Sequence, residues 1–223
     1  MLKKQIRWFL LLCALGVVVG ALALPGLAQV KPRLFVFVPS EYKPRLLQKE
    51  LQGTMPSLEV TVFGRTRDFL RGVQDQSPEA VMAPTPVLES LGLSASVQGL
   101  REGARDEAYV LVSIDRPLSP EELAGQTVGA YGLLRRKEMK SFCGKLLSTG
   151  KQKVKTVTKF ADLLPLLQFE AAAAVILPKR YASLLTAKSQ LKLVVSDLKG
   201  GRVGLPGVAL DGPGARDTVV SAL

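Results

Sequence analysis

Apolar runs of strand length alternate with amphipathic stretches from residue 33 onward. Residues 33–39 (RLFVFVP) form a continuous apolar run, residues 58–63 (LEVTVF) alternate with period two, and residues 80–83 are short and apolar. Between these runs, residues 44–51 and a segment that begins at Thr66 carry apolar residues at helical spacing. Strands that alternate with helices predict βαβ units and a largely parallel sheet.

The second half of the chain continues the alternation around one strongly amphipathic helix. Its apolar stripe lies at positions i, i+3, i+4, i+7 and i+8, which places all the members on one helical face. The stripe consists of Met139, Phe142, Cys143, Leu146 and Leu147. Further strands are predicted at residues 108–114, 127–131, 154–157, 172–177, 191–195 and 203–210, and helices at residues 163–169, 181–185 and 216–223.

Local signals mark where several of these elements begin. Thr66 is placed to cap a helix, and Thr85 followed by Pro86 is typical of an N-cap with proline at the first helical position. The segment from Ser119 to Glu122 (SPEE) has the spacing of a capping box, which predicts a helix start. The glycines between residues 200 and 207 are predicted to form turns.

The first 28 residues have the organisation of a secretory signal peptide. Basic residues precede an uncharged apolar run over residues 8–24, and small residues at Gly26 and Ala28 fit cleavage after Ala28. The alternative is an uncleaved membrane anchor, because a run of about 17 residues is at the lower limit for spanning a bilayer. Both alternatives predict a protein exported to the periplasm.

The residue types that are missing exclude several kinds of active site. The chain has no His, which excludes Ser-His-Asp and Cys-His triads and HExxH zinc sites. Cys143 is the only cysteine after residue 28, and its place on the apolar stripe indicates a core thiol rather than a nucleophile. No Walker or dinucleotide-binding spacing occurs, and the adjacent Glu121 and Glu122 do not form a facing carboxylate pair. The sequence therefore predicts no enzyme, no metal site and no cofactor.

Basic residues are concentrated in one segment of the chain. Without Lys3, Lys4 and Arg7 the 30 basic residues become 27, against 19 acidic ones. Residues 133–159 hold nine basic residues and one acidic residue, a difference of +8 that equals the net charge of residues 29–223. Two interpretations stay open: a solvated helix face and loop, or a field that attracts anions. The segment has a single aromatic residue, Phe142, so nucleic-acid binding is not predicted.

Long segments of the chain resemble type II periplasmic solute-binding proteins. Residues 107–131 (EAYVLVSIDRPLSPEELAGQTVGAY) resemble the family's crossover between lobes, and residues 159–185 (KFADLLPLLQFEAAAAVILPKRYASLL) resemble the helix and strand that report on the cleft. Residues 191–223 resemble the return strand and C-terminal helix. Residues 65–91 (RTRDFLRGVQDQSPEAVMAPTPVLESL) are most similar to phosphate/phosphonate-type binding proteins of ABC transporters.

This resemblance implies an α/β fold with two lobes, each a mostly parallel sheet flanked by helices. Residues 29–110 and 205–223 would belong to the first lobe and residues 111–204 to the second. The chain departs from the family at four places. Residues 76–79 (QSPE) and 169–172 (FEAA) each replace a Gly-x-x-Asp motif, and residues 132–135 (GLLR) replace the anion-binding Ser/Thr hydroxyls. The C-terminal helix is also shorter than is usual in the family.

Ligands of open α/β sheets bind beyond the carboxyl ends of strands, where helix N-termini present free N–H groups. There Thr85 is placed to donate its hydroxyl, and Arg135 to make a bidentate contact with an anion. Structural alternatives exist for most candidates: Thr66 and Thr85 as caps, Tyr42 and Tyr131 as packing, Arg135 as a solvated side chain. The candidate ligand-binding residues are Ser40, Tyr42, Thr66, Thr85, Tyr131, Gly132 and Arg135.

The resemblance implies an exported, monomeric binding protein rather than an enzyme. It would capture a small anionic ligand between two lobes and deliver it to the membrane permease of an ABC-type transporter. The alternative is a ligand-free interaction or sensor module in the cell envelope, which the missing hydroxyls favour. Neither hypothesis requires a metal, a cofactor or nucleic acid.

Overall fold

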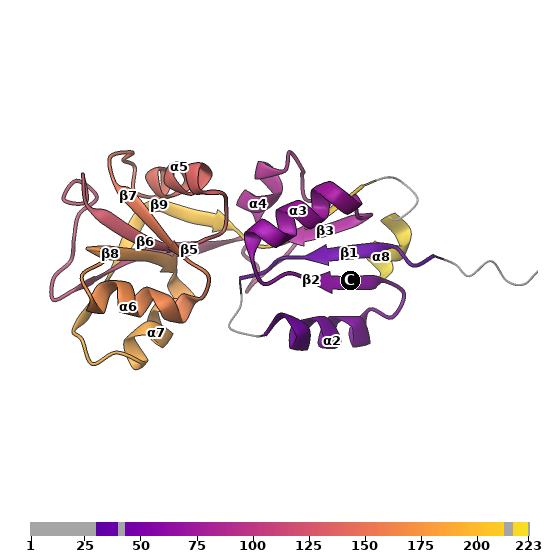
Figure 1. The fold of residues 1–223 in the computed structure, drawn as a ribbon, viewed down its shortest axis with the longest axis horizontal. Coiled ribbons are helices and arrows are strands. Elements are labelled where there is room, and N and C mark those ends of the chain that lie inside the picture. The colour runs from indigo at the N-terminus through magenta and orange to yellow at the C-terminus, as the bar shows by residue number, and fades with distance from the viewer. Residues whose placement is uncertain (1–29, 40–42, 212–215, 223) are drawn as a thin grey trace, which may run out of the picture. The chain divides into compact units, whose positions relative to one another are not determined.

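The computed structural model describes residues 30–39, 43–211 and 216–222, and Pro32–Leu223 form one compact unit (Figure 1). The predicted signal segment at residues 1–28 lies outside the described residues. Within the described ranges, no helix is long and apolar enough to cross a membrane.

The first of two five-stranded sheets has the strand order β2-β1-β3-β10-β4. Strand β1 is parallel to β2 and to β3, whereas β10 is antiparallel to β3 and to β4. The strands are β1 (Arg33–Val36), β2 (Glu59–Val62), β3 (Ala80–Ala83), β4 (Val97–Gln98) and β10 (Gly207–Leu210).

The second sheet has the order β7-β6-β8-β5-β9, and only β7, β6 and β8 run parallel to one another. Its strands are β5 (Asp106–Ile114), β6 (Thr127–Tyr131), β7 (Lys153–Val157), β8 (Ala174–Pro178) and β9 (Leu193–Gly204). The prediction of mostly parallel sheets is therefore correct for three strands in each sheet. Both sheets are mixed. In the first sheet β10 pairs antiparallel with β3 and β4, and in the second sheet β5 pairs antiparallel with β8 and β9.

The continuous apolar run at β1 is explained by helices on both faces of the first sheet (Figure 1). Leu34 and Val36 pack in a cluster with residues of α2 (Pro44–Thr54) and α8 (Arg216–Ala222). Phe35 and Phe37 belong to the opposite cluster, with α3 (Thr66–Gln76) and α4 (Thr85–Ser90). A strand buried on both faces needs apolar residues at every position rather than at alternate ones.

The predicted apolar stripe of the second half is confirmed in α5 (Arg136–Leu146) and its C-cap, Leu147. Met139, Cys143, Leu146 and Leu147 are buried, and the half-buried Phe142 packs edge-on against Tyr109 with ring centroids 5.9 Å apart. Figure 1 shows α5 on one side of the second sheet and the other two helices, α6 (Leu163–Gln168) and α7 (Lys179–Ala187), on the other. A short 3-10 turn, η1 (Phe160–Asp162), precedes α6.

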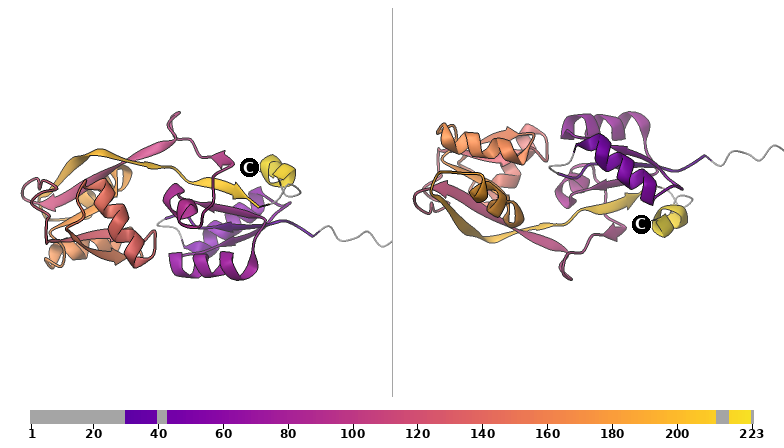
Figure 2. Two further views of the ribbon diagram at one scale, coloured as in Figure 1. Left: turned by 90° about the horizontal axis from the view of Figure 1, so that it is seen from above. Right: turned by 90° about the horizontal axis from the view of Figure 1, so that it is seen from below.

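One hydrophobic cluster contains residues of both sheets. It includes Phe37 and Phe69 of the first part of the chain together with Val110, Leu167 and Ile176 of the second. The sheets are also joined through the strand pair β5 and β9, which lie side by side (Figure 2). The predicted lobe boundaries at residues 110 and 204 stay predictions.

Two of the local signals predicted the wrong structure. The capping box forms, because the Ser119 N–H donates to Glu122 Oε2 at 2.8 Å, but turns rather than a helix follow it. The glycines between residues 200 and 204 lie within the 12-residue strand β9 rather than in turns. There β9 pairs with β5 around a register shift between Ala108 and Val110, and Gly200 has a φ of 70°, which a glycine adopts without strain.

Candidate functional site

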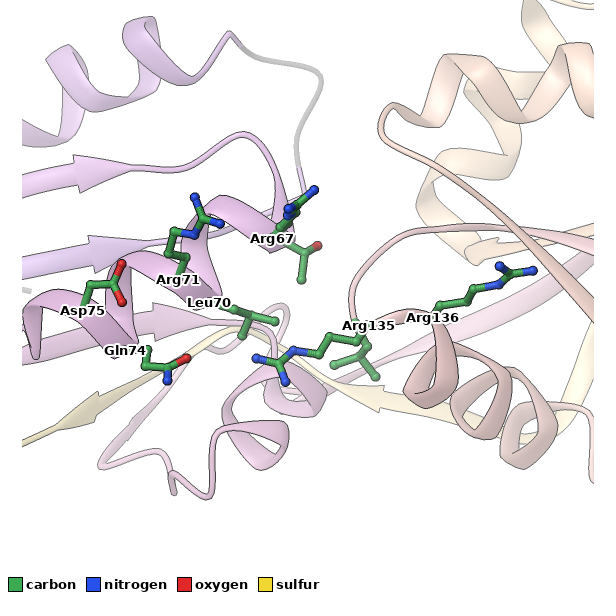
Figure 3. A pocket seen from close by; sticks show the side chains of 9 residues that line it. Arg67, Leu70, Arg71, Gln74, Asp75, Arg135 and Arg136 are labelled. Carbon is green, nitrogen blue, oxygen red and sulfur yellow. The ribbon is translucent and has the colours of Figure 1, made fainter.

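A pocket of about 520 Å³ lies between α3 and α5, and we call it the arginine pocket. Four guanidinium groups and one carboxylate, that of Asp75, line it. Figure 3 shows Arg67 and Arg71 extending from α3, whereas Arg135 and Arg136 stand at the start of α5. The full lining is Thr66, Arg67, Leu70, Arg71, Gln74, Asp75, Leu134, Arg135 and Arg136.

The topology brings the N-termini of two helices to this pocket. Helix α3 begins at Thr66, soon after β2, and α5 begins at Arg136, soon after β6. The first N–H groups of a helix have no partner within it and carry a partial positive charge. Thr66 and Arg136 therefore lie at helix N-termini, where the backbone favours a bound anion.

The four arginines of the pocket share it with a single carboxylate among the residues that the structure describes, that of Asp75. None of them forms an ion pair with any residue in the described ranges. Arg135 extends toward α3, whereas Arg136 points away from it (Figure 3). The Arg135 N–H donates to Glu138 Oε2 at 3.2 Å, so this carboxylate helps to fix the start of α5. The side chain of Arg135 stays exposed at the pocket.

Thr66 does not cap its helix, contrary to the prediction. No side-chain cap bond is present at the start of α3, and the Thr66 hydroxyl donates instead to the carbonyl oxygen of Gly132. The Gly132 N–H donates to Val157 O at 2.9 Å. This hydroxyl therefore links the start of α3 to the loop that follows β6, at the edge of the arginine pocket.

Thr85 does not cap its helix either. Its hydroxyl donates to Leu205 O at 2.9 Å, 120 residues further along the chain, and α4 has no side-chain cap bond. The backbone of Gly204 passes close to this side chain, so that a Cβ at Gly204 would meet Thr85 Cβ at 2.8 Å. Thr85 thus holds the end of β9 and does not line the arginine pocket.

Tyr131 packs in a stack of three aromatic rings, which we call the aromatic stack. Phe160 lies between Tyr131 and Tyr181, with ring centroids 4.6 Å and 4.0 Å away and interplanar angles of 22° and 20°. The Tyr181 hydroxyl donates to Pro39 O at 3.3 Å, and the Arg180 guanidinium lies 4.7 Å from the Tyr181 ring centroid. Since Tyr131 ends β6 and Tyr181 follows β8, the stack covers the carboxyl ends of both strands.

The structure therefore brings together three of the candidate residues and separates the others. Thr66 and Arg135 line the arginine pocket and Gly132 is bonded to Thr66, whereas Tyr131 and Thr85 lie elsewhere. Ser40 and Tyr42 lie outside the described residues. The sequence reasoning missed Arg67, Arg71 and Arg136; the spacing of four between the first two, which puts both on one face of α3, was the available signal.

The described residues offer no grouped acid, base and nucleophile. Cys143 is fully buried, and burial raises the pKa of its thiol to about 12. Glu121 and Glu122 lie in an exposed turn, where the Ser119 N–H and Arg116 lower the pKa of Glu122. Across the described ranges, no three His, Cys, Asp or Glu side chains are grouped so as to hold a metal ion.

No protein-family model matches the chain, and no curated protein matches it. Solved structures are similar to it. An arginine-bound mutant of ArgBP from T. maritima has a TM-score of 0.57 and 19% identity, over 86% of this chain and 93% of that one. AbpA, an amino acid ABC transporter substrate-binding protein from Streptococcus pneumoniae bound to L-arginine, has a TM-score of 0.58 and 14% identity, over 86% and 87%. The BvgS VFT2 domain of Bordetella pertussis has a TM-score of 0.55 and 14% identity, over 86% and 84%.

At these identities the similarity establishes the fold. Two of the three structures carry the names of arginine-binding or amino acid-binding proteins, and none of the three is a phosphonate-binding protein by name. The two sheets flanked by helices agree with the predicted architecture, although both sheets are mixed rather than mostly parallel. The chain has the two-lobed fold of the type II periplasmic binding proteins.

Proposed function

We propose that the protein is an exported, non-enzymatic solute-binding protein that captures a small anion in the arginine pocket. The observation that carries the proposal is the set of arginines, from α3 and from the start of α5, that line a pocket of about 520 Å³ together with a single described carboxylate, that of Asp75. That volume is within the range of small-molecule sites, and paired guanidinium groups suit carboxylate, sulfonate and phosphonate geometry.

The charge of the pocket argues for an anion and against a cationic amino acid. A ligand such as arginine, which the similar structures bind by name, would bring a further guanidinium group toward four others. Like charges in a partly desolvated site repel, and a single carboxylate, Asp75, offers little compensation. The likeness of residues 65–91 to phosphonate-type binding proteins agrees with this choice of ligand.

The fold and the sequence of the N-terminal segment together support a transport role. Similar structures include a binding protein of an amino acid ABC transporter. Residues 1–28 would export the chain to the periplasm, where it would work as a monomer and deliver its ligand to a membrane permease. The specific ligand class and the permease are part of the proposal.

A thermal-shift panel of phosphate, phosphonates, sulfonates, carboxylates and amino acids tests the function directly. A ligand at 100 times its dissociation constant stabilises the folded state by about 2.7 kcal/mol. For a chain of this size that corresponds to a rise in Tm of about 5–10 °C. We expect such a shift from one class of anion; a shift from arginine alone would contradict the proposal.

The residue that tests the pocket itself is Arg135. We expect Arg135→Ala to weaken anion binding at least tenfold, because it removes one charge-assisted contact. Arg136→Ala is the matched control, since this neighbouring arginine points away from α3 and its loss should have a smaller effect (Figure 3). Equal affinity of Arg135→Ala and the unmodified protein in a calorimetric titration removes Arg135 from the site.

A second candidate function is a ligand-free interaction or sensor module of the cell envelope. The aromatic stack favours this second function. Its rings, Tyr131, Phe160 and Tyr181, cover the carboxyl ends of β6 and β8, and ligands of open α/β sheets bind at the carboxyl ends of strands. This hypothesis predicts a flat thermal-shift panel from a well-folded sample, and unchanged behaviour of Arg135→Ala.

A further inference from the structure

A second pocket, of about 460 Å³, differs from the arginine pocket in having an apolar wall and a cationic rim, and we call it the amphipathic pocket. The half-buried side chains of Val38, Leu47, Val62 and Phe63 form much of the wall. No acidic residue is among the described residues that line it.

Three cations from separate parts of the chain surround the amphipathic pocket. Lys43 stands at the start of α2, Arg65 at the start of α3, and Lys159 after β7. All three side chains are exposed, and none forms an ion pair with any residue of the described ranges. Their mutual repulsion is relieved when an anion lies among them.

The N-terminus of α2 adds to the same field. Helix α2 has 11 residues, its N-cap Lys43 makes no side-chain cap bond, and its first turn contains no acidic residue. A helix of this length carries a partial positive charge at its start, and nothing within the described first turn neutralises it. Lys43 and Pro44 both line the pocket, so this charge faces the ligand position.

The amphipathic pocket is separate from the arginine pocket. Among the described residues, the two pockets share no lining residue. Along the chain, Arg65 and Tyr131 of the amphipathic pocket precede the hydrogen-bonded residues Thr66 and Gly132, and Arg67 and Arg135 of the arginine pocket follow them. A variant at one pocket therefore need not disturb the other.

We infer that the amphipathic pocket binds an amphipathic monoanion, a carboxylate with an apolar tail. The carboxylate would lie among Lys43, Arg65 and Lys159, and the tail would lie against Val62 and Phe63. Burial of the tail is favourable in proportion to the apolar area removed from water, and the charge-assisted contacts set the position of the head group. This site goes beyond the proposed transport of a small anion and does not depend on it.

The experiment is a calorimetric titration of the purified protein with octanoate, acetate and 1-octanol. Octanoate has both the charged head and the tail, acetate has only the head, and 1-octanol lacks the charge. We expect octanoate to bind at least tenfold more tightly than either of the others. Equal binding of octanoate and acetate, or of octanoate and 1-octanol, overturns the inference.

Substitutions of two of the three cations test whether octanoate binds in the amphipathic pocket. Arg65→Gln and Lys159→Gln should each weaken octanoate binding at least fivefold, and neither should alter the binding of small anions. Arg67→Gln is the matched control, since Arg67 lies two residues from Arg65 but lines the other pocket; octanoate binding should survive it. Unchanged octanoate affinity in both Arg65→Gln and Lys159→Gln overturns the inference. Titrations with small anions test Arg135 and the arginine pocket, so their result does not affect this conclusion.

Discussion

Glu79 joins the starts of two neighbouring strands, β1 and β3, through Arg33. Its carboxylate accepts from the Arg33 N–H at 2.9 Å, from Nε at 3.2 Å and from a terminal guanidinium nitrogen at 3.1 Å. The hydrogen bonds from the Arg33 side chain, more than any other cause, lower the pKa of Glu79 from 4.5 to about 2. Glu79, which stands where the proteins that the sequence resembles have the Asp of a Gly-x-x-Asp motif, is thus a structural residue.

We expect Glu79→Gln to reduce the free energy of unfolding at pH 7 by about 1 kcal/mol, the scale of a partly exposed ion pair. Because the folded-state pKa is lowered, the stabilisation is present above pH 5 and is lost as the pH falls toward 2. Urea denaturation at pH 7 and at pH 3 measures this, with Glu50→Gln on the exposed face of α2 as the control. A variant whose stability falls with pH as steeply as that of the unmodified protein would exclude this role.

At the scale of elements, the end of β9 depends on close contact with α4. The strand contains three glycines within five residues, and the last of them, Gly204, lies against Thr85. A Cβ there would be 2.8 Å from Thr85 Cβ and 3.2 Å from its Cγ2. The hydroxyl of the same threonine holds Leu205, so a shift of the side chain would also disturb that hydrogen bond.

We therefore expect Gly204→Ala to destabilise the protein by about 1–3 kcal/mol, as overpacking does. Gly53→Ala is the matched control: Gly53 is in α2, no atom lies within 4 Å of its added Cβ, and alanine should stabilise the helix by about 0.5–1 kcal/mol. Denaturant unfolding of both variants gives the comparison. Equal stability of Gly204→Ala and the unmodified protein would show that Thr85 has room to move.

At the scale of the whole molecule, two features extend over several elements: a hydrophobic cluster and a basic segment. A single hydrophobic cluster includes Phe35 of the first sheet and Ile176 of the second. The basic segment at residues 133–159 is divided: Arg135 lines the arginine pocket, Lys159 lines the amphipathic pocket, and lysines such as Lys140 are exposed on α5. The interpretation of a solvated face describes the exposed lysines of α5, and attraction of anions by Arg135 and Lys159 stays a prediction.

Because one of the hydrophobic clusters contains residues of both halves of the fold, we expect the two sheets to unfold together. Differential scanning calorimetry should give one transition whose calorimetric and van't Hoff enthalpies agree. Two separated transitions would mean that contacts across the cluster contribute little to stability. Adding the anion identified by the thermal-shift panel should move the single transition as a whole.

Most of the order of helices and strands was predicted from the sequence alone, because apolar spacing is a local property; the two-residue strand β4 was not predicted. Residues 80–83 and 127–131 have the predicted bounds in β3 and β6, and the predicted stripe of α5 is buried. Local reasoning failed where a distant partner decides the structure. Gly204 pairs with Asp106 of β5, and Gly200 and Gly201 lie in the irregularity between two paired parts of β9. The SPEE segment has its capping bonds without a helix.

The candidate site shows the same division. The sequence placed Thr66, Gly132 and Arg135 after strands, and therefore at the edges of sheets where ligands bind. Only the tertiary structure decided that the Thr66 hydroxyl reaches a carbonyl 66 residues away and that Arg135 meets the arginines of α3 across one pocket. Apolar periodicity depends only on residues that are close together in the sequence, so it can be recognised without a structure. The convergence of side chains depends on how separate elements pack, and no local sequence pattern specifies that packing.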